Sequence, residues 1–217
     1  GGKGLRMKAD LPKQFITLQG KPVLMRTIDR FVSALKSNVS IVLVLPEDQI
    51  DFWKELCAEH DFKTAHQIVV GGKTRFDSVK NGLAACPDDG IVGIHDGVRP
   101  LISDELINLC YEETQTHGSA LPVTPVSQSL RLRTESGSKA ISREGVLAVQ
   151  TPQCFELHKI KRAYKQPYEH RFTDDATVYE GLGYESALVE GESTNIKITT
   201  PADLKIAEAI LASSSYR

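Results

Sequence analysis

The stretch Gly90-Ile91-Val92-Gly93-Ile94-His95-Asp96-Gly97-Val98-Arg99-Pro100, residues 90–100, decides the fold. Its first half is short and apolar, which is typical of a strand buried within a sheet. Its second half is polar and is typical of a loop. In open α/β sheets, ligands bind beyond the carboxyl ends of the strands. The stretch therefore predicts a buried strand over 90–94 that delivers the loop 95–100 to a binding site.

Strand and helix patterns alternate on both sides of this stretch. Apolar residues at positions 24, 28, 31, 32 and 35 predict a helix over 23–35, and a β-branched run predicts a strand over 39–45. Further strands are expected over 67–70, 120–123, 187–189 and 196–198, and further helices over 49–60, 76–85, 104–116, 174–181 and 202–211. This alternation predicts an α/β fold, with a mostly parallel sheet and helices on both faces.

The pattern changes after residue 126. Two strand-like stretches, 127–133 and 140–149, flank a polar turn over 134–139, which predicts an exposed hairpin. A lone hairpin is only marginally stable in water, so this one needs a partner surface. A second copy of the chain is one candidate, and packing of the hairpin on its own domain is the alternative.

Composition limits the classes of function. The chain has 217 residues, enough for one α/β domain, and its 26 Lys and Arg against 28 Asp and Glu give a net charge of −2. The chain has no excess of basic residues that would indicate binding to nucleic acid or to an anionic membrane. No apolar run approaches the roughly 20 residues that span a bilayer. The four cysteines form no CxxC pair, so we expect free thiols, no zinc site and a cytoplasmic location.

A glycine-rich segment, Gly1-Gly2-Lys3-Gly4-Leu5-Arg6-Met7, is the first candidate for phosphate binding. Glycines such as Gly2 and Gly4 let backbone N–H groups approach phosphate oxygens, and Arg6 adds a planar cationic fork. A plain loop is the alternative, since no GKS or GKT follows as in a P-loop. We also expect a strand ahead of this loop, because an α/β domain rarely begins with a bare phosphate loop.

Other candidates lie farther along the chain. Lys13, after Pro12, can reach a triphosphate as a point charge. Asp96 at a strand end suits Mg²⁺, which keeps phosphate oxygens and waters as ligands, and Arg99 can hold a second phosphate. The alternatives are an ordinary surface lysine and an Asp–Arg salt bridge with His95 filling the core.

Gly71 to Ser78 join a predicted strand to a predicted helix, and backbone groups in such a turn can contact a base edge, with the Ser78 hydroxyl beside them. A plain tight turn is the alternative. Arg143 on the hairpin and Lys197 near 195–199 are, taken singly, more typical of surface residues.

Together these motifs resemble the 2-C-methyl-D-erythritol 4-phosphate cytidylyltransferases of the non-mevalonate isoprenoid pathway. The resemblance spans essentially the whole chain and is carried by GGKGLRM at 1–7, LPKQF at 11–15, GGKTRFDSV at 71–79, HDGVRP at 95–100, TPQCF at 151–155, TDDA at 173–176 and VEGESTNIKITTPADL at 189–204. It implies a single Rossmann-like nucleotidyltransferase domain with a protruding β-arm at about 126–149. It also implies a homodimer joined through the arms and a requirement for Mg²⁺ or another divalent cation.

The resemblance also implies roles for individual residues. The catalytic set is Arg6, Lys13, Arg143 and Lys197. The CTP-binding set is Gly2, Gly4, Gly72, Ser78, Asp96 and Gly97, with Asp96 also at the metal. The set that binds the sugar phosphate is Arg99, Ser129, Arg143 and Lys197, with Arg143 reaching the partner subunit's substrate.

The sequence departs from the family pattern at three places. Gly97-Val98 stands where the family commonly has Ala-Ala or Ala-Val, and Lys73 replaces an often acidic or polar residue near the base. Gln128-Ser129 stands where an Asp-Thr pair is common on the arm, so Ser129 keeps a hydroxyl but acceptor positioning is in doubt.

The expected reaction is in-line attack of a sugar-phosphate oxygen on the α-phosphorus of CTP, with loss of pyrophosphate. No general base is required, because a phosphate monoester with a second pKa of about 6 is largely ionised at neutral pH. Ribitol 5-phosphate as acceptor, UMP as the transferred group, and a non-catalytic nucleotide-binding protein remain alternatives. The last is disfavoured because a pure binder needs no transition-state cations.

Overall fold

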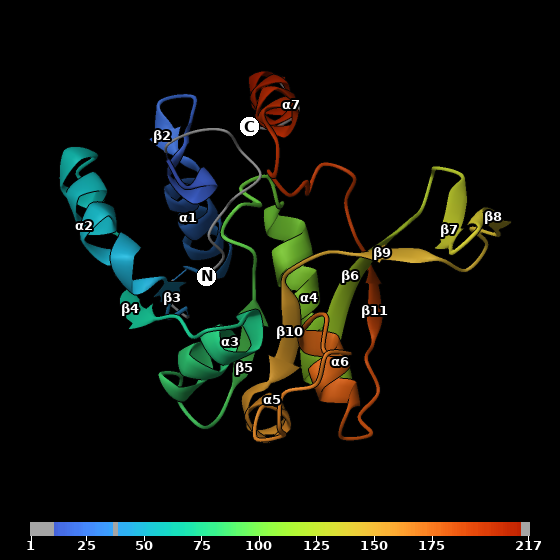
Figure 1. Cartoon of the computed structure of the whole chain (residues 1–217). Coiled ribbons are helices and arrows are strands. Elements are labelled where there is room, and N and C mark those ends of the chain that lie inside the picture. The colour runs from blue at the N-terminus through green and yellow to red at the C-terminus, as the bar shows by residue number, and fades with distance from the viewer. Residues whose placement is uncertain (1–10, 37–38, 214–217) are drawn as a thin grey trace.

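A computed structural model of the chain describes residues 11–36 and 39–213. Figure 1 shows a layered α/β body from which a two-stranded arm projects to one side. The strand expected ahead of Gly1 and the glycine-rich segment 1–7 both lie outside the described residues.

A five-stranded sheet forms the larger part of the body, in the order β11-β6-β10-β5, with β9 also paired to β6. The strands are β5 (Ile91–Ile94), β6 (Ser119–Pro125), β9 (Leu147–Val149), β10 (Gln153–Glu156) and β11 (Leu188–Glu190). Strand β10 runs antiparallel to both β5 and β6, whereas β11 is parallel to β6. Strands β5, β6 and β11 therefore point the same way, and β10 is inserted among them in the opposite direction.

A second, two-stranded parallel sheet pairs β3 (Val42–Leu45) with β4 (Gln67–Val70). The predicted strand over 39–45 is thus confirmed in its second half. Short elements near the start are a 3-10 helix at Lys13–Phe15 and the paired strands β1 (Thr17–Leu18) and β2 (Lys21–Pro22). Another 3-10 helix, Glu47–Gln49, leads into α2.

Six of the helices in the described residues agree closely with the predicted ranges, and α5 was not predicted. The helices are α1 (Val23–Leu35), α2 (Ile50–Glu59), α3 (Arg75–Ala84), α4 (Asp104–His117), α5 (Leu157–Ala163), α6 (Asp175–Glu180) and α7 (Pro201–Ala212). Side-chain caps explain where four of them begin. Ser103 caps α4 by accepting from the Leu106 amide, and capping boxes open α3, α6 and α7 at Thr74, Asp174 and Thr200.

Strand β10 and helices α3, α5 and α6 share one apolar cluster. Phe155 on β10 is fully buried and belongs to this cluster with Phe76, Tyr164 and Tyr179. The Phe76 ring stacks on Tyr164 with 4.7 Å between centroids. This packing holds the start of α3 against the sheet.

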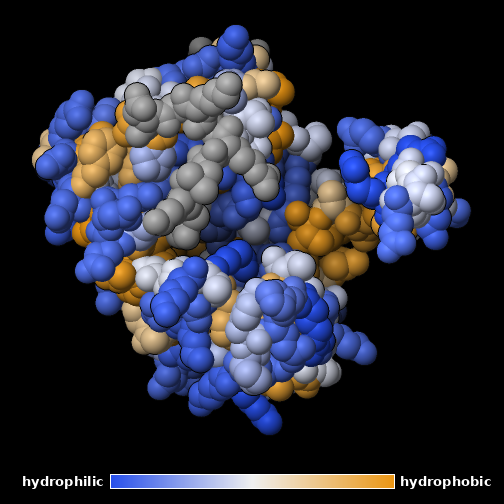
Figure 2. Space-filling view, in the orientation of Figure 1, coloured by the Kyte–Doolittle hydropathy of each residue, from blue (hydrophilic) through white to orange (hydrophobic). Residues whose placement is uncertain are grey.

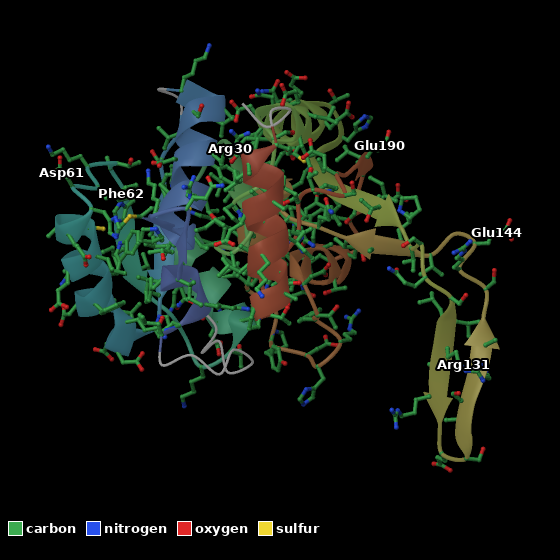
Figure 3. All side chains as sticks on the ribbon, turned by 90° about the horizontal axis from the view of Figure 1, so that it is seen from above. Arg30, Asp61, Phe62, Arg131, Glu144 and Glu190 are labelled. Carbon is green, nitrogen blue, oxygen red and sulfur yellow. The ribbon has the colours of Figure 1, made fainter. Side chains whose placement is uncertain are left out.

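The predicted hairpin exists, but its bounds differ. Its strands are β7 (Leu130–Thr134) and β8 (Gly137–Ile141), which leaves a tight turn at residues 135–136 instead of the expected 134–139. Residues 147–149, expected in the hairpin, instead form β9 and pair with β6 of the main sheet. The arm proper is therefore shorter than 126–149, because its base is held by the body. Figure 3 shows the arm, with Arg131 on it, extending away from the body.

The strand predicted over 196–198 is wrong. The described backbone there makes one long-range hydrogen bond, from the Ile198 amide to the Val98 carbonyl, without a ladder. Ile198 is fully buried beside Val98 and Leu101, so its apolar character reflects packing and not strand pairing. Among the described residues, no helix combines the length and apolar character needed to cross a bilayer.

Truncating Phe155 to alanine is expected to lower the free energy of unfolding by about 3–5 kcal/mol, because the ring is lost from a closed core. Chemical denaturation measures this change. Ile206→Ala on α7, where the side chain is half exposed, serves as the control and is expected to cost about 0.5 kcal/mol or less. Equal losses in the two variants would contradict the assigned core.

Candidate functional site

A cleft of about 680 Å³ lies at the carboxyl ends of β3, β4 and β5. Polar segments from four parts of the chain line it: Lys13 and Gln14, residues 71–75 with Ser78, residues 95–97, and Lys197. Its floor continues between β3 and β5, whose residues 42–45 and 92–94 also line it. The predicted site residues Lys13, Gly72, Ser78, Asp96, Gly97 and Lys197 are thus brought together around one space.

Asp96 lies between two cations. The Lys197 ammonium is 3.0 Å from its carboxylate oxygens, and Arg99 Nε donates to Oδ2 at 3.0 Å. Burial by itself opposes ionisation of Asp96, but the charges and hydrogen bonds of Lys197 and Arg99 outweigh it and lower the pKa to about 2. The carboxylate is therefore fully ionised at neutral pH.

Arg99 is largely committed to the protein. Its side chain is 11% exposed, and besides Asp96 it donates from Nη1 to the Asn195 carbonyl at 2.7 Å. The Asp–Arg salt bridge considered as an alternative from sequence is therefore real. The same Asp96 also lines the cleft, so the salt bridge and a role in binding are compatible.

His95 supports the loop from within the core. Its ring packs edge-on against Phe31, with 4.7 Å between ring centroids. Nε2 lies 3.2 Å from the Arg99 carbonyl, and Nδ1 lies 3.0 Å from Thr151 Oγ1. Burial dominates and lowers the pKa of His95 to about 4, so the ring is neutral at pH 7.

The hydrogen positions in this network follow from its acceptors. A carbonyl can only accept, so Nε2 of the neutral His95 ring carries the proton and donates to Arg99. Nδ1 then accepts from the Thr151 hydroxyl, whose oxygen in turn accepts from the Asp96 amide at 3.1 Å. His95 and Thr151 together fix the backbone of the loop at Asp96.

The turn over 71–78 forms the opposite wall of the cleft. Thr74 and Asp77 close a capping box at the start of α3. The buried Ser78 hydroxyl accepts from the Gly72 amide at 3.1 Å and donates to the Thr74 carbonyl at 2.9 Å. The single hydrogen of the Ser78 hydroxyl is therefore used within the turn, and Ser78 stabilises the turn itself. The backbone groups of residues 71–78 are then the natural contacts for the edge of a base.

Gly72 and Gly97 are both tightly packed. A Cβ at Gly72 would lie 2.2 Å from the Asp77 Cβ, so no larger residue fits this turn without moving it. At Gly97 an added Cβ would approach the flexible end of Leu24 at 2.9 Å. The family's alanine at position 97 would therefore require a shift of Leu24.

Other predicted residues lie elsewhere. Ser129 and Arg143 are exposed at the arm, and neither lines the cleft; Arg143 donates to the Ser127 carbonyl. Gly2, Gly4 and Arg6 lie outside the described residues. The structure thus gathers the predicted nucleotide-side residues from position 13 onward, and it leaves the arm residues apart from the cleft of their own chain.

The segments 151–155 and 173–176 contribute to the resemblance, but the sequence predicted no roles for their side chains. Thr151 supports Asp96, and the buried Gln153 Oε1 accepts from the amides of Asp175 and Ala176. Asp175 in turn forms an ion pair with Arg75 on α3. Polar side chains in an otherwise apolar strand and at the start of a helix are the sequence signal that could indicate such roles. The signal does not identify the bonding partners, because these lie up to 100 residues away in the chain.

A divalent cation would fit one part of this site. Among the described residues that line the cleft, Asp96 is the only carboxylate, and the described residues hold no cluster of three or more His, Cys, Asp or Glu suited to a metal. A single ionised carboxylate suits Mg²⁺, which takes its remaining ligands from substrate phosphates and water.

A polar cleft at the strand ends of an α/β fold, lined in the described part of the chain by cations and a single carboxylate, is typical of a nucleotide-binding protein. A family model described as 2-C-methyl-D-erythritol 4-phosphate cytidylyltransferase matches residues 1–213. The chain belongs to this family, and it is a cytidylyltransferase.

Relatives and solved structures agree with this assignment. The chain is 53% identical over 211 residues to the 2-C-methyl-D-erythritol 4-phosphate cytidylyltransferase of Bacteroides fragilis, covering 97% of this chain and 96% of that protein. It is 48% identical over 214 residues to the enzyme of the same name from Porphyromonas gingivalis, covering 98% and 95%. The crystal structure of the enzyme of that name from Thermus thermophilus superposes with a TM-score of 0.76 at 31% identity, covering 95% of this chain and 97% of that chain.

His95→Gln is expected to remove a pH dependence of stability. The folded pKa of about 4 lies below the ordinary 6.5, so the unfolded chain binds more protons between these values. The contribution of neutral His95 to the free energy of unfolding is therefore fully present above pH 6.5 and is lost as the pH is lowered toward 4. The loss is roughly 3 kcal/mol, at about 1.4 kcal/mol per pKa unit. Denaturation of both proteins across this range measures the difference, and identical slopes would contradict a neutral buried His95.

Proposed function

We propose that this chain transfers CMP from CTP to 2-C-methyl-D-erythritol 4-phosphate, releasing pyrophosphate, as its relatives' names describe. The observation that carries the proposal is the shared cleft. Lys13, the turn 71–78, Asp96 and Lys197 are far apart in sequence, and they line one space in a chain of this family.

The chemistry needs positioning and charge, and the cleft offers these. An oxygen of the acceptor phosphate forms a bond to the α-phosphorus, and the bond from that phosphorus to the bridging α–β oxygen breaks. Pyrophosphate leaves with those electrons. The acceptor is already ionised, so no base is required, and Lys13 supplies positive charge where negative charge develops on the triphosphate.

Asp96 is the residue that would hold Mg²⁺ or another divalent cation. When bound, the cation would neutralise charge on the phosphates. Lys197 and Arg99 hold Asp96 in place, and a phosphate oxygen can compete for the same cations. We assign Lys197, which lines the cleft, to the acceptor phosphate next to the triphosphate site, with Arg99 behind it holding Asp96.

The family relationship favours methylerythritol phosphate over ribitol 5-phosphate as the acceptor. Competition between the two sugar phosphates under limiting enzyme distinguishes them. Preferential use of ribitol 5-phosphate would reverse the choice of substrate and leave the chemistry unchanged.

The free cysteines among the described residues are typical of a reducing compartment, which supports the expected cytoplasmic location.

We further propose a homodimer joined through the arms. Every residue of β8 is exposed, including the apolar Ile141, and so is the apolar Leu132 on β7. Figure 2 shows apolar side chains gathered where the arm meets the body, and Leu147 and Val149 of β9 are exposed there. Such surface on a projecting hairpin favours contact with a second copy, which would carry Ser129 and Arg143 toward the partner's cleft.

Lys13→Ala is expected to reduce turnover by about 10²–10³, the scale for losing one preorganised electrostatic donor. Pyrophosphate release with CTP, Mg²⁺ and the sugar phosphate measures this. Lys54→Ala, at an exposed position on α2 away from the cleft, is the matched control and should remain fully active. Normal turnover of Lys13→Ala would contradict its assigned role.

Mixed dimers test whether active sites are shared between subunits. Arg143→Ala and Lys13→Ala homodimers are each expected to be impaired, the first chiefly in its use of the sugar phosphate. If the arm of one subunit completes the site of the other, refolding the two variants together restores part of the activity. No recovery, with mixed dimers verified by tagging each variant differently, would mean that each chain forms its own site.

A further inference from the structure

Asp175 is a fully buried carboxylate beneath the wall of the cleft. Arg75 donates to it through both terminal nitrogens, with Nη1 2.9 Å from Oδ1, and the Tyr164 hydroxyl donates to the same Oδ1 at 2.6 Å. A bidentate guanidinium–carboxylate pair fixes direction as well as distance. Asp175 therefore holds Arg75 in one orientation.

Arg75 is the first residue of α3, directly after the Thr74 cap. The turn that ends there is attached to β3 on its other side, where the Gly71 amide donates to the Leu45 carbonyl at 2.7 Å. In the described residues, β3 and β4 share no ladder with the larger sheet. The Arg75–Asp175 ion pair, together with the packing of Phe76 beside it, joins the end of the turn to the larger sheet and its helices.

The same residue also connects, through its backbone amide, to the opposite wall of the cleft. The amide of Asp175 donates to the Gln153 Oε1 at 3.0 Å. Gln153 lies two residues after Thr151, whose hydroxyl oxygen accepts from the Asp96 amide. A continuous path of bonds thus joins the turn 71–78 to Asp96 beneath the cleft.

We propose that Asp175 is a positioning residue that sets, through Arg75, the distance between the turn 71–78 and the Asp96 loop, and thereby the fit of the nucleotide. The inference rests on the proposed function, in which CTP lies between these two walls. A merely structural ion pair would affect stability and both substrates alike. A positioning role acts on the nucleotide first, because the acceptor side at Lys197 and Arg99 is held by other contacts.

Two variants and a control test the proposal. Arg75→Lys keeps the charge and loses the fork, and Tyr164→Phe removes one hydrogen bond from Asp175 at a residue that does not line the cleft. Lys161→Met is the control: Lys161 also ties α5 to the segment after α3, by donating to the Cys86 carbonyl and Asp88, without touching the turn. Each variant is compared with wild type for thermal stability and for KM of both substrates.

Arg75→Lys is expected to raise the KM for CTP on the order of 10- to 100-fold, the scale of a small misplacement at an active site, with the KM for the sugar phosphate within about twofold. Tyr164→Phe should also raise the KM for CTP, but by less. Because Tyr164 does not line the cleft, such a change would exclude direct contact of Arg75 with CTP as the sole cause. Lys161→Met should leave it unchanged. Equal changes for both substrates, or a loss of stability alone, would overturn the proposal. Absence of pyrophosphate release by wild type would instead refute the proposed function itself.

Discussion

The cleft depends on the ion pairs of one carboxylate. Asp96 binds Lys197, 101 residues away in the chain, and Arg99 within its own loop. These contacts join the end of β5 to the segment before α7, and they hold Lys197 at the cleft that Lys13 also lines. Removing the carboxylate would leave a largely buried guanidinium without its charged partner, a state that costs free energy and frees the loop.

Hydrogen bonds between uncharged groups also hold the Asp96 loop in place. The Asp96 amide, the Thr151 hydroxyl and the His95 ring form one chain with a single consistent set of protons. On the other wall, the capping box at Thr74 and the Ser78 hydroxyl hold the turn locally. The site is therefore preorganised by side chains that do not themselves need to contact the substrate.

Much of this arrangement could be predicted from sequence because it depends on local patterns. The loop after 90–94 lies at a strand end as expected, and Ser103 and Thr200 begin helices as their side-chain chemistry predicts. Strand β10 could not be predicted, because its four residues acquire their pairing only from β5 and β6. The strand prediction over 196–198 fails for the converse reason: Ile198 is buried by packing, without a ladder to any described strand. The roles of Thr151 and Asp175 depend on partners distant in sequence, which no local pattern reveals.

The most direct measurement is a crystal structure with CTP and Mg²⁺ bound. The account predicts that the triphosphate lies between Lys13 and the Asp96 loop, that the cytosine edge meets the backbone of residues 71–78, and that the cation contacts Asp96. A nucleotide bound outside this cleft, or bound with its base at Lys197 and its phosphates at the turn, would contradict the account.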